Sequence, residues 1–196
     1  MPSLADAVLS GAVESRTAAI VRDVGLIAAA VAFTALAAQV SFNVPWTPVP
    51  YTGQTAAVLL AGTVLGSWRG LLAMAAYVAL GSLGLPLFSG GASGADQLIG
   101  ITGGYLVGFV LAGWLTGALA QRGWDRSAPS AAALMLIGNV AIYALGVPVL
   151  AVVGGMGFER AVVAGALVFA PWDAAKIVAA SLLLPLAWRM VGRYSE

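Results

Sequence analysis

Long apolar stretches, separated by short segments rich in charge, proline or glycine, dominate the chain. A helix that spans a bilayer needs about 20 mainly apolar residues, and charges, prolines and glycines indicate where each stretch ends. Six spanning helices are predicted from these boundaries, at 24–40, 54–66, 70–85, 101–121, 130–150 and 172–191. The second predicted span is the shortest. Three alternatives to a full crossing therefore stay open for it: a tilted helix, a re-entrant segment, or a helix merged with its neighbour.

Composition agrees with a membrane protein of all-α class. Of the 196 residues, 61% are hydrophobic and 9% are charged, whereas a soluble domain carries about 25% charged residues. We expect a single membrane domain over 1–196, with 1–22 as a cytoplasmic segment and 24–191 as the transmembrane bundle. The segment 154–170 is a candidate for an extra interfacial helix that follows a glycine turn.

Basic residues are unevenly distributed between the two sides that six spans define. Only Arg160 lies on the side opposite the termini, and Lys176 lies inside the last span. The seven others share the side of both termini: Arg16, Arg22, Arg69, Arg122, Arg126, Arg189 and Arg193. Because cytoplasmic loops carry an excess of Lys and Arg, both termini are expected in the cytoplasm. A cleaved signal peptide ending near Ala35-Leu36-Ala37 is the rival interpretation, which the long polar segment before the apolar run disfavours.

The absent residue types exclude several classes of site. The sequence has no cysteine and no histidine, which rules out disulfides, thiolate zinc sites and histidine-dependent triads. A net charge of +1 provides no basic stripe for nucleic acid. No glycine-rich phosphate loop precedes Lys176, the one lysine. We therefore expect no metal, no cofactor and no nucleic-acid partner.

Two segments on the outer side have unusual composition. Residues 43–54 contain Pro45, Pro48 and Pro50, which prevent a helix and give a stiff extended segment. This segment is either a connector that anchors Trp46 and Tyr51 at the membrane interface or a rigid lid over a pocket. Residues 84–105 are rich in glycine, which lets the backbone approach a ligand closely.

Asp173 and Lys176 carry the strongest single signal. Pro171 suits a first helical turn, which places the two charged residues three positions apart on one face of the last span. A charge deep in a bilayer costs at least ~2.5 kcal/mol and usually marks function. The alternatives are an ion pair that only stabilises the helix, or a lysine that reaches the interface. Most basic residues of this chain lie on the inner side of the membrane, so a lysine in the outer half of the last span favours an anionic ligand.

Together these segments resemble the BioY family, the biotin-binding S components of energy-coupling factor transporters. The residues that carry the resemblance are Val44-Pro45, Thr47-Pro48-Val49-Pro50, Thr52, Gln54-Thr55, Leu59-Leu60-Ala61-Gly62, Leu65-Gly66, Tyr77, Gly81, Gly84-Leu85-Pro86, Phe88, Gly100, Thr102-Gly103-Gly104-Tyr105-Leu106, Gly108-Phe109, Asp173 and Lys176. They extend over residues 24–190, in order and with fitting spacing. The chain departs from the family pattern at Ile101, where a proline is usual, and at Ala170-Pro171-Trp172.

The resemblance implies a six-helix subunit of the cell membrane that binds biotin on its extracellular side. It also implies a transmembrane coupling protein and two ATPase subunits as partners, with no cofactor held by this chain. Asp173 is expected to accept ureido N–H bonds and Lys176 to stabilise the carboxylate tail. The substrate-binding candidates are Asp173, Lys176, Trp46, Thr47, Tyr105, Gly103, Gly104, Trp172 and Asn139. Ala28 and Ala32 are candidates for the contact with the coupling protein, since small residues permit close helix approach.

Three other functions stay open. One is an S component for another vitamin, and the second is a small membrane enzyme with Asp173 and Lys176 as an acid–base pair. The third is an autonomous channel or carrier, which needs a polar lining across the bilayer. The first five predicted spans offer few polar residues for such a lining, namely Thr34, Gln39, Thr63, Thr116 and Asn139.

Overall fold

A computed structural model of the chain describes residues 1–9 and 15–194. The helices that match the six predicted spans are α2 (Arg16–Gln39), α3 (Gln54–Leu65), α4 (Ser67–Ser82), α6 (Gly103–Ala120), α7 (Ala128–Val153) and α9 (Ala170–Tyr194). The shorter elements are α1 (Leu4–Val8), α5 (Asp96–Ile99), α8 (Phe158–Gly165), the 3-10 turns η1 (Ser89–Gly91) and η2 (Leu167–Phe169), and the strands β1 (Ser41–Val44) and β2 (Thr47–Thr52). The prediction of a mainly helical protein is confirmed.

Within residues 1–9 and 15–194, four helical segments are long and apolar enough to cross a membrane by length and composition. They are Arg16–Gln39, Gly103–Ala120, Ala128–Val153 and Phe158–Gly192. The helix α3 has 12 residues and is therefore about 18 Å long, against a hydrocarbon core of about 30 Å. As the sequence indicated, this element is a short helix, separated from α4 by Gly66 alone.

The first long helix begins earlier than predicted. The apolar pattern places its start at Val24, whereas α2 begins at Arg16. Ser15 caps it, because its hydroxyl accepts a hydrogen bond from the backbone N–H of Ala18 at 3.2 Å. The first turns of α2 carry polar residues, so hydropathy alone does not mark them as part of the helix.

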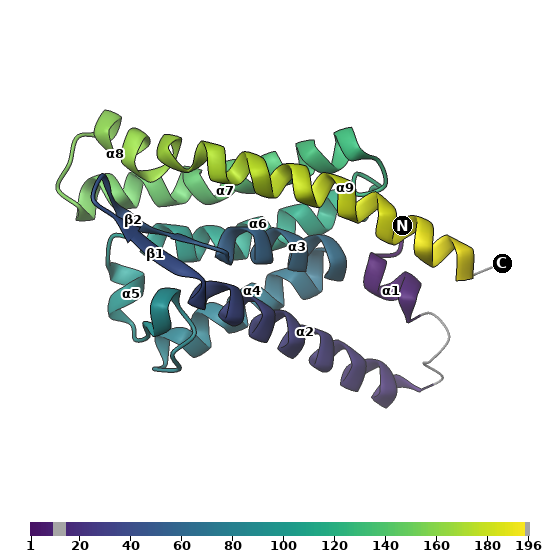
Figure 1. The fold of residues 1–196 in the computed structure, drawn as a ribbon. Coiled ribbons are helices and arrows are strands. Elements are labelled where there is room, and N and C mark those ends of the chain that lie inside the picture. The colour runs from purple at the N-terminus through teal and green to yellow at the C-terminus, as the bar shows by residue number, and fades with distance from the viewer. Residues whose placement is uncertain (10–14, 195–196) are drawn as a thin grey trace.

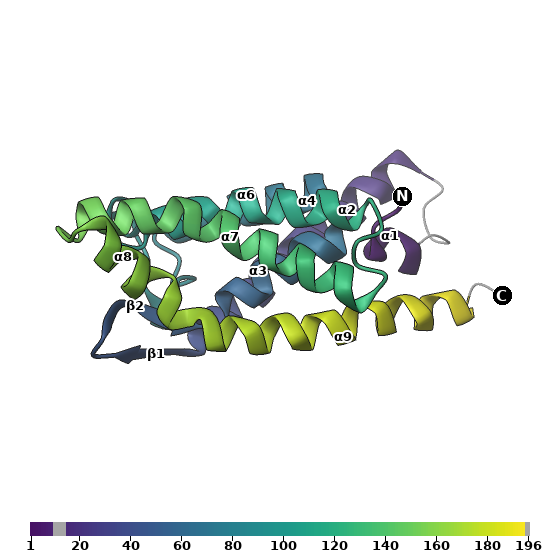
Figure 2. The ribbon, with the colours of Figure 1, turned by 90° about the horizontal axis from the view of Figure 1, so that it is seen from above.

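The long helices run side by side and give the molecule two distinct ends (Figures 1 and 2). One end, the hairpin end, carries β1, β2, α5 and α8. The opposite end carries α1, the loop between α6 and α7, and the last turns of α9. Both ends of the described chain thus lie at the same end of the bundle, as an even number of crossings requires.

The helix α6 lies at the centre and packs against α3, α4 and α7. Its glycines make this possible, since a Cβ atom on Gly113 would lie 2.9 Å from the carbonyl oxygen of Gly70. A Cβ atom on Gly108 would lie 2.9 Å from the Cα atom of Ile142. These glycines therefore serve packing within the chain, whereas Ala28 and Ala32 on α2 are exposed.

The proline segment is extended as predicted, but it forms a hairpin that the sequence analysis did not foresee. Strands β1 and β2 pair antiparallel, with Ser41 opposite Thr52 and Val44 opposite Thr47. Beside it lies α8, the extra helix that was expected within 154–170, and the chain reaches it through a turn at Gly155, where φ is +61°. The hydroxyl of Thr47 donates to the carbonyl of Ala164 at 2.7 Å and joins the two elements.

Candidate functional site

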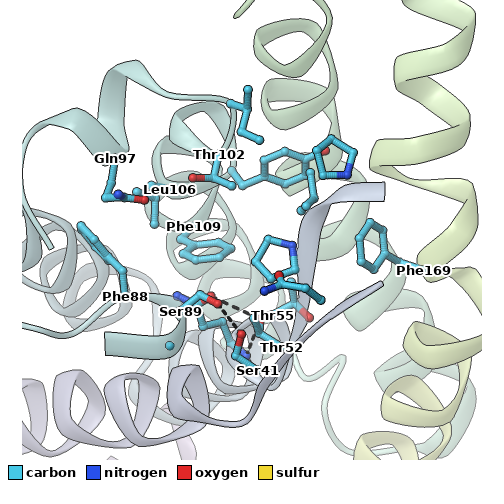
Figure 3. Close-up of a pocket in the computed structure, with 18 of the residues that line it drawn as sticks. Ser41, Thr52, Thr55, Phe88, Ser89, Gln97, Thr102, Leu106, Phe109 and Phe169 are labelled. Atoms are coloured by element: carbon cyan, nitrogen blue, oxygen red, sulfur yellow. Dashed lines mark hydrogen bonds between the residues drawn. The ribbon is translucent and has the colours of Figure 1, made fainter. Parts of the chain in front are cut away.

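A cavity of about 430 Å³ lies at the hairpin end, under β2 and between α6, α7 and α9. Figure 3 shows its apolar wall, with Phe109 and Leu106 from α6, Phe88 before η1 and Phe169 from η2. Its remaining lining residues are Ser41, Asn43, Pro48, Val49, Pro50, Thr52, Gln54, Thr55, Ser89, Gly90, Gln97, Ile101, Thr102, Tyr105, Tyr143, Asp173 and Lys176. A mainly apolar cavity with a few polar groups is typical of a small-molecule site.

Asp173 and Lys176 form an ion pair in the wall of this cavity. The Nζ atom of Lys176 lies 3.2 Å from Oδ1 of Asp173, and Asp173 as a whole is only 5% exposed. Lys176 also donates to the hydroxyl of Thr55 at 2.7 Å. The phenol of Tyr143 donates to the other carboxylate oxygen, Oδ2. A pair that is desolvated to this degree is stable only when further hydrogen bonds satisfy it, and Tyr143 and Thr55 supply them.

The hairpin docks on the chain around the start of α9. The phenol of Tyr51 donates to the carbonyl of Val168 at 2.6 Å, and the indole of Trp172 donates to the carbonyl of Thr52 at 3.3 Å. These bonds place β2 over the first turn of α9, where Asp173 lies. The proline-rich segment therefore covers the cavity, as the lid interpretation of the sequence expected.

Strand β1 and the 3-10 turn η1 meet on the other side of the cavity. The hydroxyls of Ser41 and Ser89 are 2.7 Å apart and join β1 to η1 (Figure 3). Beneath them, the side-chain amide of Gln54 donates to the phenol oxygen of Tyr77 at 2.6 Å, and that phenol donates to the carbonyl of Leu87. This buried chain of bonds holds the loop before η1 against α3 and α4.

The structure brings three of the predicted site residues to the cavity wall, namely Asp173, Lys176 and Tyr105. Tyr105 directs its hydroxyl away to the carbonyl of Gly165, at 2.8 Å. Trp172 lies outside the lining, with its ring 5.5 Å from Nζ of Lys176, a cation–π distance.

Other predicted site residues lie elsewhere. Gly103 and Gly104 are buried in the first turn of α6, below Thr102 and Tyr105, where they allow close packing rather than line the cavity. Asn139 is buried within α7 and outside the lining, and its side-chain oxygen has no hydrogen-bond partner among the residues that the structure describes.

Trp46 and Thr47 also miss the main cavity. They line a separate groove of about 310 Å³ between the hairpin tip and α8, together with Pro45, Pro48, Met156, Arg160 and Ala164. Pro48 borders both cavities. The hairpin turn thus places these two residues in a different cavity from the ion pair.

Several residues that line the cavity could not be predicted from the sequence, or were not. Tyr143 carries a usable signal, because a phenol within an apolar span needs a hydrogen-bond partner. Ser41, Asn43 and Gln97 carry none, since polar residues are ordinary in the segments that connect the long helices. Over residues 1–9 and 15–194, no group of three or more acidic side chains lies close enough to hold a metal ion.

Comparisons with known proteins agree with this arrangement. A model of the BioY family matches residues 9–193. The biotin transporter BioY of Rhizobium etli is 39% identical over 143 residues, which cover 69% of this chain and 76% of that protein. The biotin transporter BioY of Thermotoga maritima is 40% identical over 141 residues, 72% of this chain and 82% of that protein. A probable biotin transporter BioY of Pyrococcus horikoshii is 37% identical over 171 residues, 87% of this chain and 97% of that protein.

The fold is also similar to a solved structure. The crystal structure of the S-component for biotin from an ECF-type ABC transporter superposes with a TM-score of 0.80. The similarity covers 90% of this chain and 95% of that one, at 22% sequence identity. The helical arrangement described above is therefore that of a known membrane fold.

Proposed function

The chain belongs to the BioY family, and we propose that it is the biotin-binding S component of an energy-coupling factor transporter. The protein is a transport protein and not an enzyme, so the acid–base alternative for Asp173 and Lys176 falls away. The single observation that carries the substrate assignment is the cavity that combines an apolar wall with polar side chains and one ion pair. Biotin matches it, with an apolar bicyclic body, a polar ureido edge and a carboxylate tail.

The contacts of the ion pair favour one orientation of biotin. An ammonium group has three donors, and Lys176 uses two of them, on Asp173 and Thr55. The pair is neutral overall and presents one free donor beside carboxylate acceptors. This arrangement is complementary to a ureido edge, on which a carbonyl acceptor lies beside an N–H donor. We therefore assign the ureido edge to the pair, whereas the sequence had suggested the carboxylate tail for Lys176.

The carboxylate tail then belongs to the polar residues of β1, η1 and α5 that line the cavity. Ser41, Asn43, Ser89 and Gln97 gather where the hairpin meets the loops around η1 and α5. Their hydroxyl and amide donors suit a carboxylate near the cavity mouth. Among the sequence candidates outside the cavity, Trp172 supports Lys176 through its ring, and Gly103 and Gly104 support the start of α6.

The partners and the orientation in the membrane follow from the same proposal. The S component works with a transmembrane coupling protein and two ATPase subunits, and the exposed Ala28 and Ala32 form the contact with the coupling protein. Both termini lie in the cytoplasm, because the end of the bundle with α1 and the last turns of α9 carries most of the arginines. The cavity consequently opens to the outside of the cell.

Direct binding by the detergent-purified protein tests the assignment. Labelled biotin should bind, and excess unlabelled biotin should displace it while riboflavin and thiamine should not. Asp173→Asn should weaken binding by at least tenfold, whereas Asp96→Asn, at an exposed position on α5 outside the cavity, should leave it unchanged. Displacement by another vitamin, or equal effects of the two variants, would contradict the proposal.

A further inference from the structure

Four polar side chains from three helices form one hydrogen-bonded chain in the cavity wall. In order they are Tyr143 on α7, Asp173 and Lys176 on α9, and Thr55 on α3. All four line the cavity. The two charged members are the ligand-binding pair of the proposed function, on which this inference rests. The two neutral members supply hydrogen bonds to this pair, and no role in ligand binding has been assigned to them so far.

Tyr143 and Lys176 bond different oxygens of the Asp173 carboxylate. The hydroxyl of Tyr143 donates to Oδ2, while Nζ of Lys176 bonds Oδ1. A carboxylate on the first turn of a helix can rotate, and each oxygen accepts more than one bond. With a donor on each oxygen, the rotation is restrained before the ligand enters.

Thr55 restrains the position of the Lys176 ammonium group in a similar way. The four-carbon stem of lysine gives its ammonium group a wide range of positions. Bonds to Thr55 at 2.7 Å and to Asp173 at 3.2 Å restrict Nζ to one position and leave a single N–H for a ligand. The ring of Trp172, 5.5 Å from Nζ, contributes attraction without competing for a donor.

We propose that Tyr143 and Thr55 are positioning residues of the biotin site, which hold the Asp173–Lys176 pair in the one geometry that presents a donor beside an acceptor. Because they come from α7 and α3, they also make the site depend on how three helices pack. A site ordered before binding avoids the entropic cost of ordering side chains during binding. Loss of either hydroxyl should therefore weaken biotin binding although neither residue needs to touch biotin.

A double-mutant cycle tests Tyr143. Tyr143→Phe should weaken biotin binding by about tenfold in the wild-type protein. In an Asp173→Asn background, where no ionised carboxylate remains to be oriented, the same change should weaken it less than about twofold. Tyr51→Phe is the matched control, because its phenol bonds a backbone carbonyl and not the pair. Its effect, whatever its size, should be the same in both backgrounds.

Two substitutions test Thr55 independently of that background. Thr55→Val keeps the shape but removes the hydroxyl, and should weaken biotin binding by about tenfold. Thr55→Ser keeps the hydroxyl and should restore binding to within about threefold of the wild type. Each variant is first checked for a monodisperse elution profile and a normal melting temperature.

The outcomes are distinct. An equal effect of Tyr143→Phe in both backgrounds would overturn the role of Tyr143, and equal losses for Thr55→Val and Thr55→Ser would overturn that of Thr55. A folded wild-type protein that does not bind biotin would instead refute the proposed function. Both positioning roles would be established by two results together. The effect of Tyr143→Phe would be smaller in the Asp173→Asn background than in the wild type, and Thr55→Ser would restore the binding that Thr55→Val loses.

Discussion

Trp188 donates its indole N–H to Oδ2 of Asp125 at 2.6 Å, which joins α9 to the loop between α6 and α7 at the end opposite the cavity. Asp125 is fully buried, and within the described residues its Oδ1 atom has no hydrogen-bond partner. The guanidinium of Arg126 lies 4.4 Å from the centre of the Trp188 ring. Burial raises the pKa of Asp125 above its ordinary value, and the bond from Trp188 and the charge of Arg126 offset only part of that rise.

The raised pKa of Asp125 predicts a loss of stability with rising pH. At a pH below the ordinary carboxyl pKa of 3.8, Asp125 is protonated in both the folded and the unfolded protein. Above it the unfolded state releases the proton first, so the folded state loses stability until its own raised pKa is passed. Asp125→Asn keeps an acceptor for Trp188 and removes the charge. Its melting temperature should exceed that of the wild type by about 2–4 °C at pH 7, and the difference should shrink at pH 4.

The matched control for Asp125 is Asp96→Asn, which removes an exposed carboxylate from α5. The difference in melting temperature between Asp96→Asn and the wild type should be the same at pH 4 and pH 7, whereas the difference for Asp125→Asn should be larger at pH 7. A variant at Asp125 that is less stable than the wild type at pH 7 would show that the buried carboxylate is a net stabilising contact.

Gly113 provides a second stability prediction, since α6 and α4 touch there through their backbones. A Cβ atom at Gly113 would lie 2.8 Å from Cγ of Met74 and 2.9 Å from the carbonyl oxygen of Gly70. Gly113→Ala should therefore destabilise the protein by about 1–3 kcal/mol. Gly25→Ala on α2, where no atom lies within 4 Å of the added methyl group, should leave it unchanged or stabilise it by up to about 1 kcal/mol. Thermal unfolding in detergent measures both, and equal effects would contradict the packing argument.

The approximate positions of six helices could be predicted because apolar runs of a membrane protein are interrupted by charges, prolines and glycines, although α3 is only 12 residues long. The hairpin could not, because strand pairing depends on contacts between residues apart in the chain, such as Ser41 with Thr52. Prolines at Pro48 and Pro50 argue against a central strand, but a hairpin of two strands has free edges that tolerate them. The same contacts placed Trp46 and Thr47 in the smaller groove.

The candidate site was predictable to the extent that it lies on one helix. Asp173 and Lys176 are three positions apart, so helical spacing places them together. Tyr143 and Thr55 join them from α7 and α3, 30 and 121 residues away from their partners along the chain. No local pattern reports such a contact, which depends on how the helices pack around α6.

The coupling contact is tested on the exposed face of α2. Ala32→Trp adds bulk where close helix approach is proposed, so biotin uptake by cells should fall while binding by the purified protein stays near normal. Val140→Trp, at an exposed position on α7, is the control and should preserve both. Equal loss of uptake and binding with Ala32→Trp would mean that this position affects the fold of the subunit and not the contact with a partner.

The membrane orientation is tested with single cysteines, which is simple because the chain contains none of its own. Ser93 lies in the loop before α5 at the hairpin end, and Ser127 precedes α7 at the opposite end. An impermeant thiol reagent added to intact cells should label Ser93→Cys and not Ser127→Cys. After the cells are opened, both should react. The reverse pattern in intact cells would place the cavity on the cytoplasmic side.

The orientation of biotin is tested by comparing it with biotinamide, which lacks the anionic tail. If the ion pair binds the ureido edge, which both ligands share, Lys176→Ala should weaken the two alike, by about 10- to 150-fold. Gln97→Ala removes a polar residue of α5 from the cavity wall and should weaken biotin more than biotinamide, because an amide donor that faces a charge contributes more than one that faces a neutral group. Loss confined to biotin in Lys176→Ala would place the carboxylate at the lysine instead. If Lys176→Ala changes neither affinity, the lysine only stabilises Asp173, and the free N–H assigned to it does not contact the ligand.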